Sequence, residues 1–414
     1  MAQEMKERPK AWDSEGSEGS KGRETLVIPR LDGFVSEFTA AAFRRSGTEV
    51  VILPSADADT RAARERWTVG GECWPFRVMA GDYMKALEGG QAHRERRFLA
   101  PKFSGASCGL NDFGANLRKI FDAGGFESAR TASPDLGNFE EFYRFCGPMA
   151  FRALWLGLVT AELLDQALLL ARPTEKVSGE AEKMTRIAVG EALAILENGN
   201  DDVIVRRLEA ALARAAIFIG EAAEAKETGP LVGFVGEPFV RFCNLLNNHI
   251  VWRIESSGGR VWRSPLTDEV RLVFFRSPPA IQRELAADER LLRAAFEPFW
   301  SLIGLRVPND GWEEIRALGS QWLPDATGLD WAIGAIGRAR WLLDRLRVDG
   351  LLALFSRPCL LGSSFLAFQQ AWKAESQDRP FRLAHASDGE SDWSRIIGEY
   401  MDKAAQDRDA KLRL

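Results

Sequence analysis

The sequence predicts an α/β fold in which two three-layer, parallel-sheet domains flank an all-helical insert. Short apolar runs at 24–31 and 49–54 enclose a segment with helical periodicity, the pattern of a parallel strand–helix–strand unit. From 138 to 228 the apolar residues recur only at helical spacing. At 230 the strand–turn–helix pattern resumes. This alternation in both parts indicates Rossmann- or flavodoxin-like domains.

The first α/β domain is expected over 24–137. Its two opening strands are followed by a helix at about 75–87, a third strand in "RRFLAP" and a helix in "FGANLRKIFDAGG". The preceding residues, 1–23, are polar and mixed in charge and contain no apolar core. We therefore expect a flexible N-terminal tail there and no signal peptide.

The insert and the second domain are expected over 138–228 and 229–385. The second domain begins with a strand in "PLVGFVGEPF", and a later helix ends at a glycine pair before the extended "RVWRSPL". A helical stretch rich in Trp and Phe occupies about 280–345, and strand, loop and helix follow over 349–372. The charged, amphipathic segment 386–414 is expected to be a C-terminal helix.

The composition restricts the class of protein. The chain carries 54 Lys and Arg against 59 Asp and Glu, a net charge of −5, which argues against a nucleic-acid partner. The apolar stretch "ALWLGLVTA" has nine residues, short of the ~20 needed to span a bilayer, so no membrane span is expected. The five scattered cysteines indicate reduced thiols and a cytoplasmic location.

Three cysteines are expected at strand-to-helix corners: Cys73, Cys108 and Cys359. In open α/β sheets these corners lie at the carboxyl edge, where ligands bind. The start of a helix also favours a thiolate, because its N–H groups are unpaired and carry partial positive charge. Small residues surround the second of these cysteines and let backbone N–H groups approach an anionic, sulfur-rich centre: Gly105, Ser107 and Gly109.

Cysteine also has a plainer role, because a lone cysteine often serves as a small buried apolar residue. That role is expected for Cys146, in an apolar helical run; it is favoured but left open for Cys243, and it also stays open for the other three. Zinc is disfavoured because the chain has no CxxC or HxxxH pair, and its histidines lie in ordinary contexts: His93, His249 and His385. Three thiolates without a fourth match an iron–sulfur cubane with one open iron.

Nucleotide and serine-hydrolase motifs are missing from the sequence. It contains no GxGxxG after a strand, no GxxxxGK[ST] and no GxSxG, so any ATP hydrolysis belongs to another protein. The stretch "VGEPFVR" places Glu237 and Arg241 just past a strand. They could contact a substrate there, but an ion pair between them at a helix start is the expected role.

Five phrases together resemble one family. They are "ECWPFRVMAGDYMKAL", "FLAPKFSGASCGLNDFG", "RALWLGLVTAELLDQALLLARPTEKVSGE", "VGFVGEPFVRFCNLLNNHIVWRIESSGGRV" and "DGLLALFSRPCLLGSSF". In this order, over about 24–390, they resemble the 2-hydroxyacyl-CoA dehydratase-like proteins, in the branch related to the C-terminal regions of acyl-CoA dehydratase activases.

The resemblance implies an iron–sulfur cluster, either one [4Fe-4S] or a double cubane [8Fe-9S] at a subunit interface. Cys73 matches the cysteine of the family's E-C-x-P phrase, Cys108 that of its G-P-C phrase, and Cys359 its late cysteine after a strand and loop. The second phrase reads "GASC" here, followed by "GLNDFG", and "LLGSS" replaces a common Met-Pro turn. Because these departures alter the surroundings of the cluster, the family's substrate is not assigned to this chain.

The resemblance further implies a separate ATP-hydrolysing iron–sulfur activator as electron donor, a homodimer or heterodimer, and a small-molecule or acyl-CoA-type substrate. The leading interpretation is a component that uses low-potential electrons for reductive or dehydration chemistry. Two alternatives stay open: a non-catalytic, cluster-carrying scaffold subunit of a larger activase or dehydratase assembly, and a cluster-free relative. The sequence predicts that Cys73, Cys108 and Cys359 face one cleft between the α/β domains. With three suitable cysteines per chain, a double cubane would require two chains.

Overall fold

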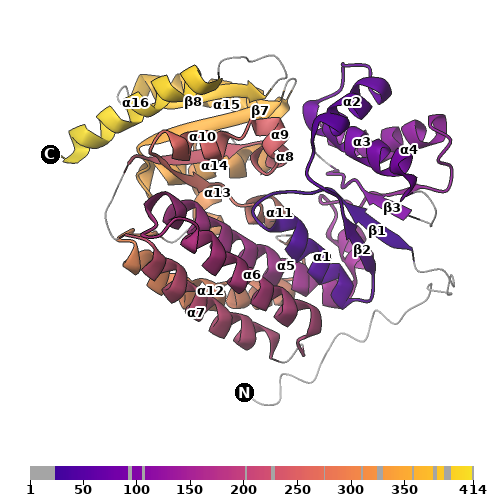
Figure 1. Cartoon of the computed structure of the whole chain (residues 1–414), viewed down its shortest axis with the longest axis horizontal. Coiled ribbons are helices and arrows are strands. Elements are labelled where there is room, and N and C mark those ends of the chain that lie inside the picture. The colour runs from indigo at the N-terminus through magenta and orange to yellow at the C-terminus, as the bar shows by residue number, and fades with distance from the viewer. Residues whose placement is uncertain are drawn as a thin grey trace.

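Two four-stranded parallel sheets, with a helical segment between them in chain order, form the fold (Figure 1). The computed structural model describes residues 24–91, 96–104, 108–200, 203–224, 229–274, 276–308, 311–323, 330–356, 359–375, 380–386 and 393–412. The expected α/β class with two parallel sheets is therefore confirmed. The expected N-terminal tail, 1–23, lies outside the described residues.

The first sheet has the strand order β2-β1-β3-β4. Its strands are β1 (Thr25–Ile28), β2 (Glu49–Ile52), β3 (Arg96–Leu99) and β4 (Arg130–Ala132). Side chains of a strand alternate between faces, so β1 serves two cores. Leu26 and Ile28 pack with α1 (Val35–Arg45) and the long helix α5 (Phe139–Ala171). Val27 packs on the opposite face with α3 (Trp74–Ala86) and α4 (Phe113–Ala123).

A helix not expected from the sequence, α2 (Ala58–Trp67), precedes α3. It is almost free of apolar periodicity, and its start is fixed instead by a capping box in which the Asp57 carboxylate accepts the Thr60 N–H at 2.9 Å. The two helices touch closely, since a Cβ on Gly81 of α3 would lie 2.4 Å from the Thr60 carbonyl oxygen. Glycine at position 81 is what allows this contact.

The second sheet repeats the arrangement of the first, with the order β6-β5-β7-β8. Its strands are β5 (Leu231–Gly236), β6 (Arg260–Arg263), β7 (Gly350–Ser356) and β8 (Phe381–Ala386). Strand β5 is buried along its whole length: Val232 and Phe234 pack toward α10 (Ile250–Ser256) and α16 (Trp393–Leu412), and Val235 packs toward α14 (Asp330–Asp344). The helices of this part are α8 (Pro238–Arg241), α9 (Asn244–Asn247), α10 (Ile250–Ser256), α11 (Thr267–Phe274), α12 (Pro279–Leu302), α13 (Trp312–Ser320), α14 (Asp330–Asp344), α15 (Leu360–Glu375) and α16 (Trp393–Leu412).

The helical segment consists of α5, α6 (Glu180–Asn198) and α7 (Ile204–Ala222), joined by α12 from the second part of the chain (Figure 1). One stretch, Phe139–Thr174, is long and apolar enough to cross a membrane, but 94% of its most apolar window is buried inside the protein. Its apolarity is explained by packing against α1, α6, α7 and β6. The domain limits expected at 137/138 and 228/229 stay predictions.

Candidate functional site

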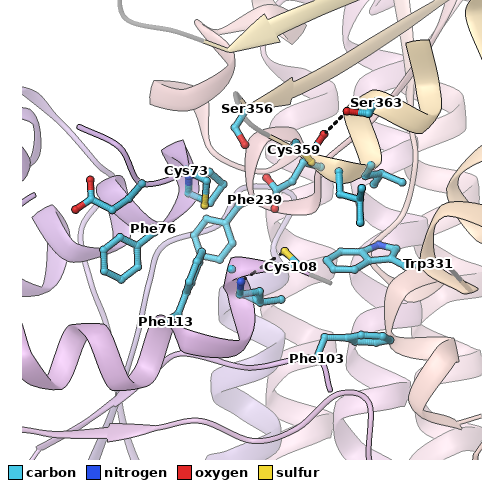
Figure 2. A pocket seen from close by; sticks show the side chains of 18 of the residues that line it. Cys73, Phe76, Phe103, Cys108, Phe113, Phe239, Trp331, Ser356, Cys359 and Ser363 are labelled. Carbon is cyan, nitrogen blue, oxygen red and sulfur yellow. Dashed lines mark hydrogen bonds between the residues drawn. The ribbon is translucent and has the colours of Figure 1, made fainter. Parts of the chain in front are cut away.

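A cavity of about 850 Å³ lies where residues following both sheets meet. Its lining includes Cys73, Cys108 and Cys359, which Figure 2 shows around one shared space. Cys73 and Cys108 belong to the N-terminal α/β part, and Cys359 belongs to the C-terminal one. The expectation that these three cysteines share a cleft between the two α/β parts agrees with this lining. The sulfur separations that a cubane requires stay a prediction.

The strand order explains why the cavity forms here. In the second sheet β5 and β7 are hydrogen-bonded neighbours, and the chain leaves β5 toward β6 but leaves β7 toward β8 on the other side. Loops that diverge in this way open a crevice at the carboxyl edge of a parallel sheet. Glu237 follows β5 directly and Cys359 follows β7. Cys108 follows β3, which holds the same place in the first sheet as β7 in the second.

Cys73 does not lie at a strand-to-helix corner, so that part of the sequence interpretation is wrong. It follows α2 and caps the start of α3, in a helix–loop–helix connection. The error has the same origin as the missed helix, because the polar stretch before Cys73 lacks the apolar periodicity that marks a helix in the sequence.

Each of the three cysteines immediately precedes a helix. Cys73 precedes α3, Cys108 precedes the short 3₁₀ helix η3 (Gly109–Asp112), and Cys359 precedes α15. The Leu110 N–H donates to the Cys108 Sγ at 3.5 Å. Cys108 is exposed, and the other two are half-buried. Gly105 and Ser107, singled out in the sequence beside Gly109, lie outside the described residues.

The pKa values of these thiols contradict the expected preference for thiolate. Burial raises the pKa of Cys73 to about 11 and that of Cys359 to about 12, and it also raises the pKa of Cys108. Backbone N–H groups at the helix starts lower each pKa, but desolvation outweighs them. Without a bound cation the thiols therefore stay protonated at neutral pH.

Glu237 acts on all three thiols. Its negative charge raises the pKa of Cys73, of Cys108 and of Cys359, and its side chain lines the same cavity. The Val240 N–H donates to its Oε2 at 2.8 Å, so the carboxylate caps α8 and is held in place. Burial raises the pKa of Glu237 itself to about 7.

The expected ion pair between Glu237 and Arg241 is not formed, so that prediction is wrong. Arg241 is buried and forms its ion pair with Glu269. Its guanidinium also donates to the carbonyls of Gly236 and Ser264. The arginine thus joins α8 to β5, α11 and the end of β6, and the carboxylate of Glu237 is left to the cavity.

Aromatic rings form much of the cavity wall, a feature that sequence reasoning missed. Phe76 and Phe113 pack with tilted rings whose centroids are 5.0 Å apart, and Phe103 and Trp331 pack likewise with centroids 5.4 Å apart. Phe239 adds a further ring (Figure 2). These residues come from α3, α4, α8, α14 and the loop after β3. Helical periodicity marks such rings as buried, but it does not reveal that rings from distant elements face one cavity.

The remaining cysteines are core residues, as expected. Cys146 on α5 and Cys243 before α9 are buried within apolar clusters. Of the histidines, His385 of β8 lines the cavity, His249 precedes α10, and His93 lies outside the described residues.

The donor groups of the cavity determine which metal centre it could hold. Among the described residues, no three His, Cys, Asp or Glu side chains are grouped closely enough to hold a metal ion, which speaks against a single-ion site such as zinc. Cubane ligands bind different irons and stand farther apart. The charged side chains in the described lining are acidic, Glu72, Asp112 and Glu237, with no Lys or Arg among them. The lining thus offers three sulfur donors and carboxylate oxygens, a donor set that suits iron.

Comparisons with known proteins identify no relative: no family model matches the chain, and no curated protein matches it significantly. The site must therefore be interpreted from its own geometry.

Proposed function

We propose that the protein is an iron–sulfur component of the kind found in 2-hydroxyacyl-CoA dehydratase-like systems, with a cubane cluster bound by Cys73, Cys108 and Cys359. One observation supports the proposal most directly. The three cysteines precede three separate helices, and all of them line one cavity of about 850 Å³. Cys108 also raises the pKa of both Cys73 and Cys359, which indicates that it lies near each of them.

When bound, such a cluster accepts single electrons and leaves one iron open to a substrate. The residues of this chain supply the surroundings. Phe76, Phe113, Phe239 and Trp331 line the cavity and offer flat apolar surfaces to a small molecule. The indole N–H of Trp331 is buried and has no hydrogen-bond partner among the described residues.

The described lining favours an uncharged, apolar substrate body. It contains no Lys or Arg that would neutralise a phosphate or carboxylate. If the substrate is an acyl-CoA, we propose that only its acyl end enters this part of the cavity. The electrons come, in this proposal, from a separate ATP-hydrolysing iron–sulfur activator.

The test is anaerobic reconstitution of the chain with ferrous iron and sulfide, followed by counts of iron and acid-labile sulfide per chain. We expect a brown protein with iron and sulfide in equal amounts for a single cubane, and a slight excess of sulfide for a sulfide-bridged pair of cubanes. A chain that binds neither iron nor sulfide would refute the proposal. A chain that holds the cluster but takes no electron from any low-potential donor would favour the scaffold alternative.

A further inference from the structure

One carboxylate is built into the cavity beside the three cysteines, and its placement is controlled by the backbone around it. Gly236, at the end of β5, has a φ of +143°, and a Cβ at this position would lie 2.0 Å from the Leu354 carbonyl oxygen of β7. The next N–H, that of Glu237, donates to this same oxygen at 3.1 Å. The close contact between the two central strands, β5 and β7, therefore fixes the backbone position of Glu237.

The side chain of Glu237 is held as firmly as its backbone. Its Oε2 accepts the Val240 N–H at 2.8 Å, and Pro238 occupies the first turn of α8. A carboxylate has about four lone-pair positions, so capping a helix leaves acceptor capacity for another partner. Arg241, the nearest basic residue along the chain, is turned away to Glu269.

The other acidic residues of the cavity are placed differently. Glu72 uses its two oxygens to accept the N–H groups of Val69 and Gly70 at 3.0 and 2.9 Å. Asp112 is exposed. Glu237 follows β5, the neighbour of the strand that Cys359 follows, and it lines the cavity together with the three cysteines.

We infer that Glu237 is the fourth protein ligand of the cluster and binds, through a carboxylate oxygen, the iron that the three thiolates leave open. This inference rests on the proposed function. It supplies each iron of one cubane with a ligand from this chain. A carboxylate is a harder donor than a thiolate and so suits iron less well, which makes it the ligand that a substrate displaces.

The test compares the wild type with Glu237→Gln and Glu237→Cys after reconstitution and reduction, with cyanide as the probe of the fourth iron. Glutamine preserves the helix cap but is a poor iron ligand, and cysteine supplies a thiolate instead. Electron paramagnetic resonance reports the change of the reduced cluster as cyanide is added. We expect cyanide to change half of the cluster signal in Glu237→Gln at a concentration at least about tenfold lower than the wild type requires. We expect Glu237→Cys to resist cyanide more than wild type does.

The matched control is Glu175→Gln. The Glu175 carboxylate also accepts N–H groups at a helix start, those of Gly179 and Ala181 at 2.6 and 3.0 Å, but outside the cavity. Its cyanide response should equal that of wild type. Equal responses of wild type, Glu237→Gln and Glu237→Cys, all carrying a full cluster, would overturn the inference and leave the proposed function standing. A wild-type chain without a cluster would overturn both.

Discussion

At the scale of the residue, environment separates the five cysteines into two groups. Cys146 and Cys243 are surrounded by apolar side chains, whereas the other three line a cavity. The sequence indicated this division from the expected strand-to-helix corners, although Cys243 also directly precedes a helix, α9. It did not predict that Glu237 and Arg241 form no ion pair, because the i,i+4 spacing between them indicates one. The partners that draw Arg241 away, Glu269 and the Ser264 carbonyl, lie beyond the next strand.

Substitution of Cys108 tests its role as a ligand. We expect Cys108→Ser to fold normally but to lose most of its iron after reconstitution, because serine has nearly the shape of cysteine without its affinity for iron. Cys146→Ser should keep the cluster and lose about 1–2 kcal/mol of stability, since it buries a hydroxyl in an apolar region. Iron analysis and chemical denaturation measure the two effects. A full iron complement in Cys108→Ser would contradict the assignment.

The raised thiol pKa values predict slow alkylation of the cluster-free protein. Cys108 is exposed, so its reaction with iodoacetamide is limited by the fraction of thiolate and not by access. A raised pKa means less thiolate at any given pH. The rate, followed by mass spectrometry, should therefore still be rising with pH where a cysteine in a short peptide has reached its plateau. If the rate instead reached its plateau at a lower pH than in the peptide, the pKa of Cys108 would be lowered, and the helix start would outweigh burial.

At the scale of the element, the sequence predicted strands and helices with a clear apolar pattern and missed those without one. Strands β1, β2, β5 and β7 were expected because they are apolar runs between turn signals. Helix α2 was missed because a capping box, and not an apolar face, defines it. Strand β4 was missed because it has three residues, and β8 because half of its side chains are only partly buried or exposed.

The break within α5 provides a test of backbone strain. Gly147 has φ 72° and ψ 161°, a conformation that only glycine adopts readily, and Pro148 follows it. Although no atom lies within 4 Å of a Cβ added there, we expect Gly147→Ala to lower the stability by about 1–3 kcal/mol. Gly190, in the exposed helical surface of α6, is the control, and Gly190→Ala should raise the stability by about 0.5–1 kcal/mol. Equal changes in stability for Gly147→Ala and Gly190→Ala, measured by denaturant unfolding, would contradict backbone strain at Gly147.

The contact between α2 and α3 predicts a pH-dependent stability. Burial raises the pKa of Asp82 to about 7, and the Thr60 hydroxyl donates to its Oδ1 at 2.6 Å. The unfolded chain has an Asp pKa near ~3.9, so between about pH 4 and pH 7 the folded state binds more protons and its stability falls as the pH rises. Asp82→Asn removes this titration. Relative to wild type, the variant should gain up to about 2–4 kcal/mol from pH 4 to pH 8.

Chemical denaturation of both proteins across that pH range measures the difference. If the difference in stability between Asp82→Asn and wild type did not change with pH, Asp82 would have the same pKa in the folded and unfolded states.

At the scale of the whole molecule, two sheets of identical strand order present their carboxyl edges to one cavity. The sequence predicted that meeting because the rule for open α/β sheets places ligands at this edge. It could not predict the aromatic walls, because their rings come from elements far apart in sequence, including α3, α8 and α14, and periodicity does not show which elements pack together. It placed Glu237 just past a strand, where it could contact a substrate, but expected an ion pair with Arg241 instead.

The proposed cluster ligands come from both parts of the chain, so a bound cluster is expected to stabilise the molecule as a whole. Binding to the folded state alone raises its stability, and the proposed ligands precede α3, η3 and α15. In differential scanning calorimetry, removal of the cluster with an anaerobic chelator should lower the unfolding temperature of both α/β parts. Cys359→Ser should unfold at the temperature of the stripped protein. A shift confined to one part would show that the other contributes no ligand.

The position of Cys359 also sets an order of events during synthesis of the chain. Cys73, Cys108 and Glu237 leave the ribosome well before Cys359, which precedes the last helix but one. The cluster site of the proposed function is therefore incomplete until Cys359 has been synthesised. Insertion of iron and sulfide would then be a late step of maturation, and a chain that ends before Cys359 would lack one of the three proposed thiolate ligands.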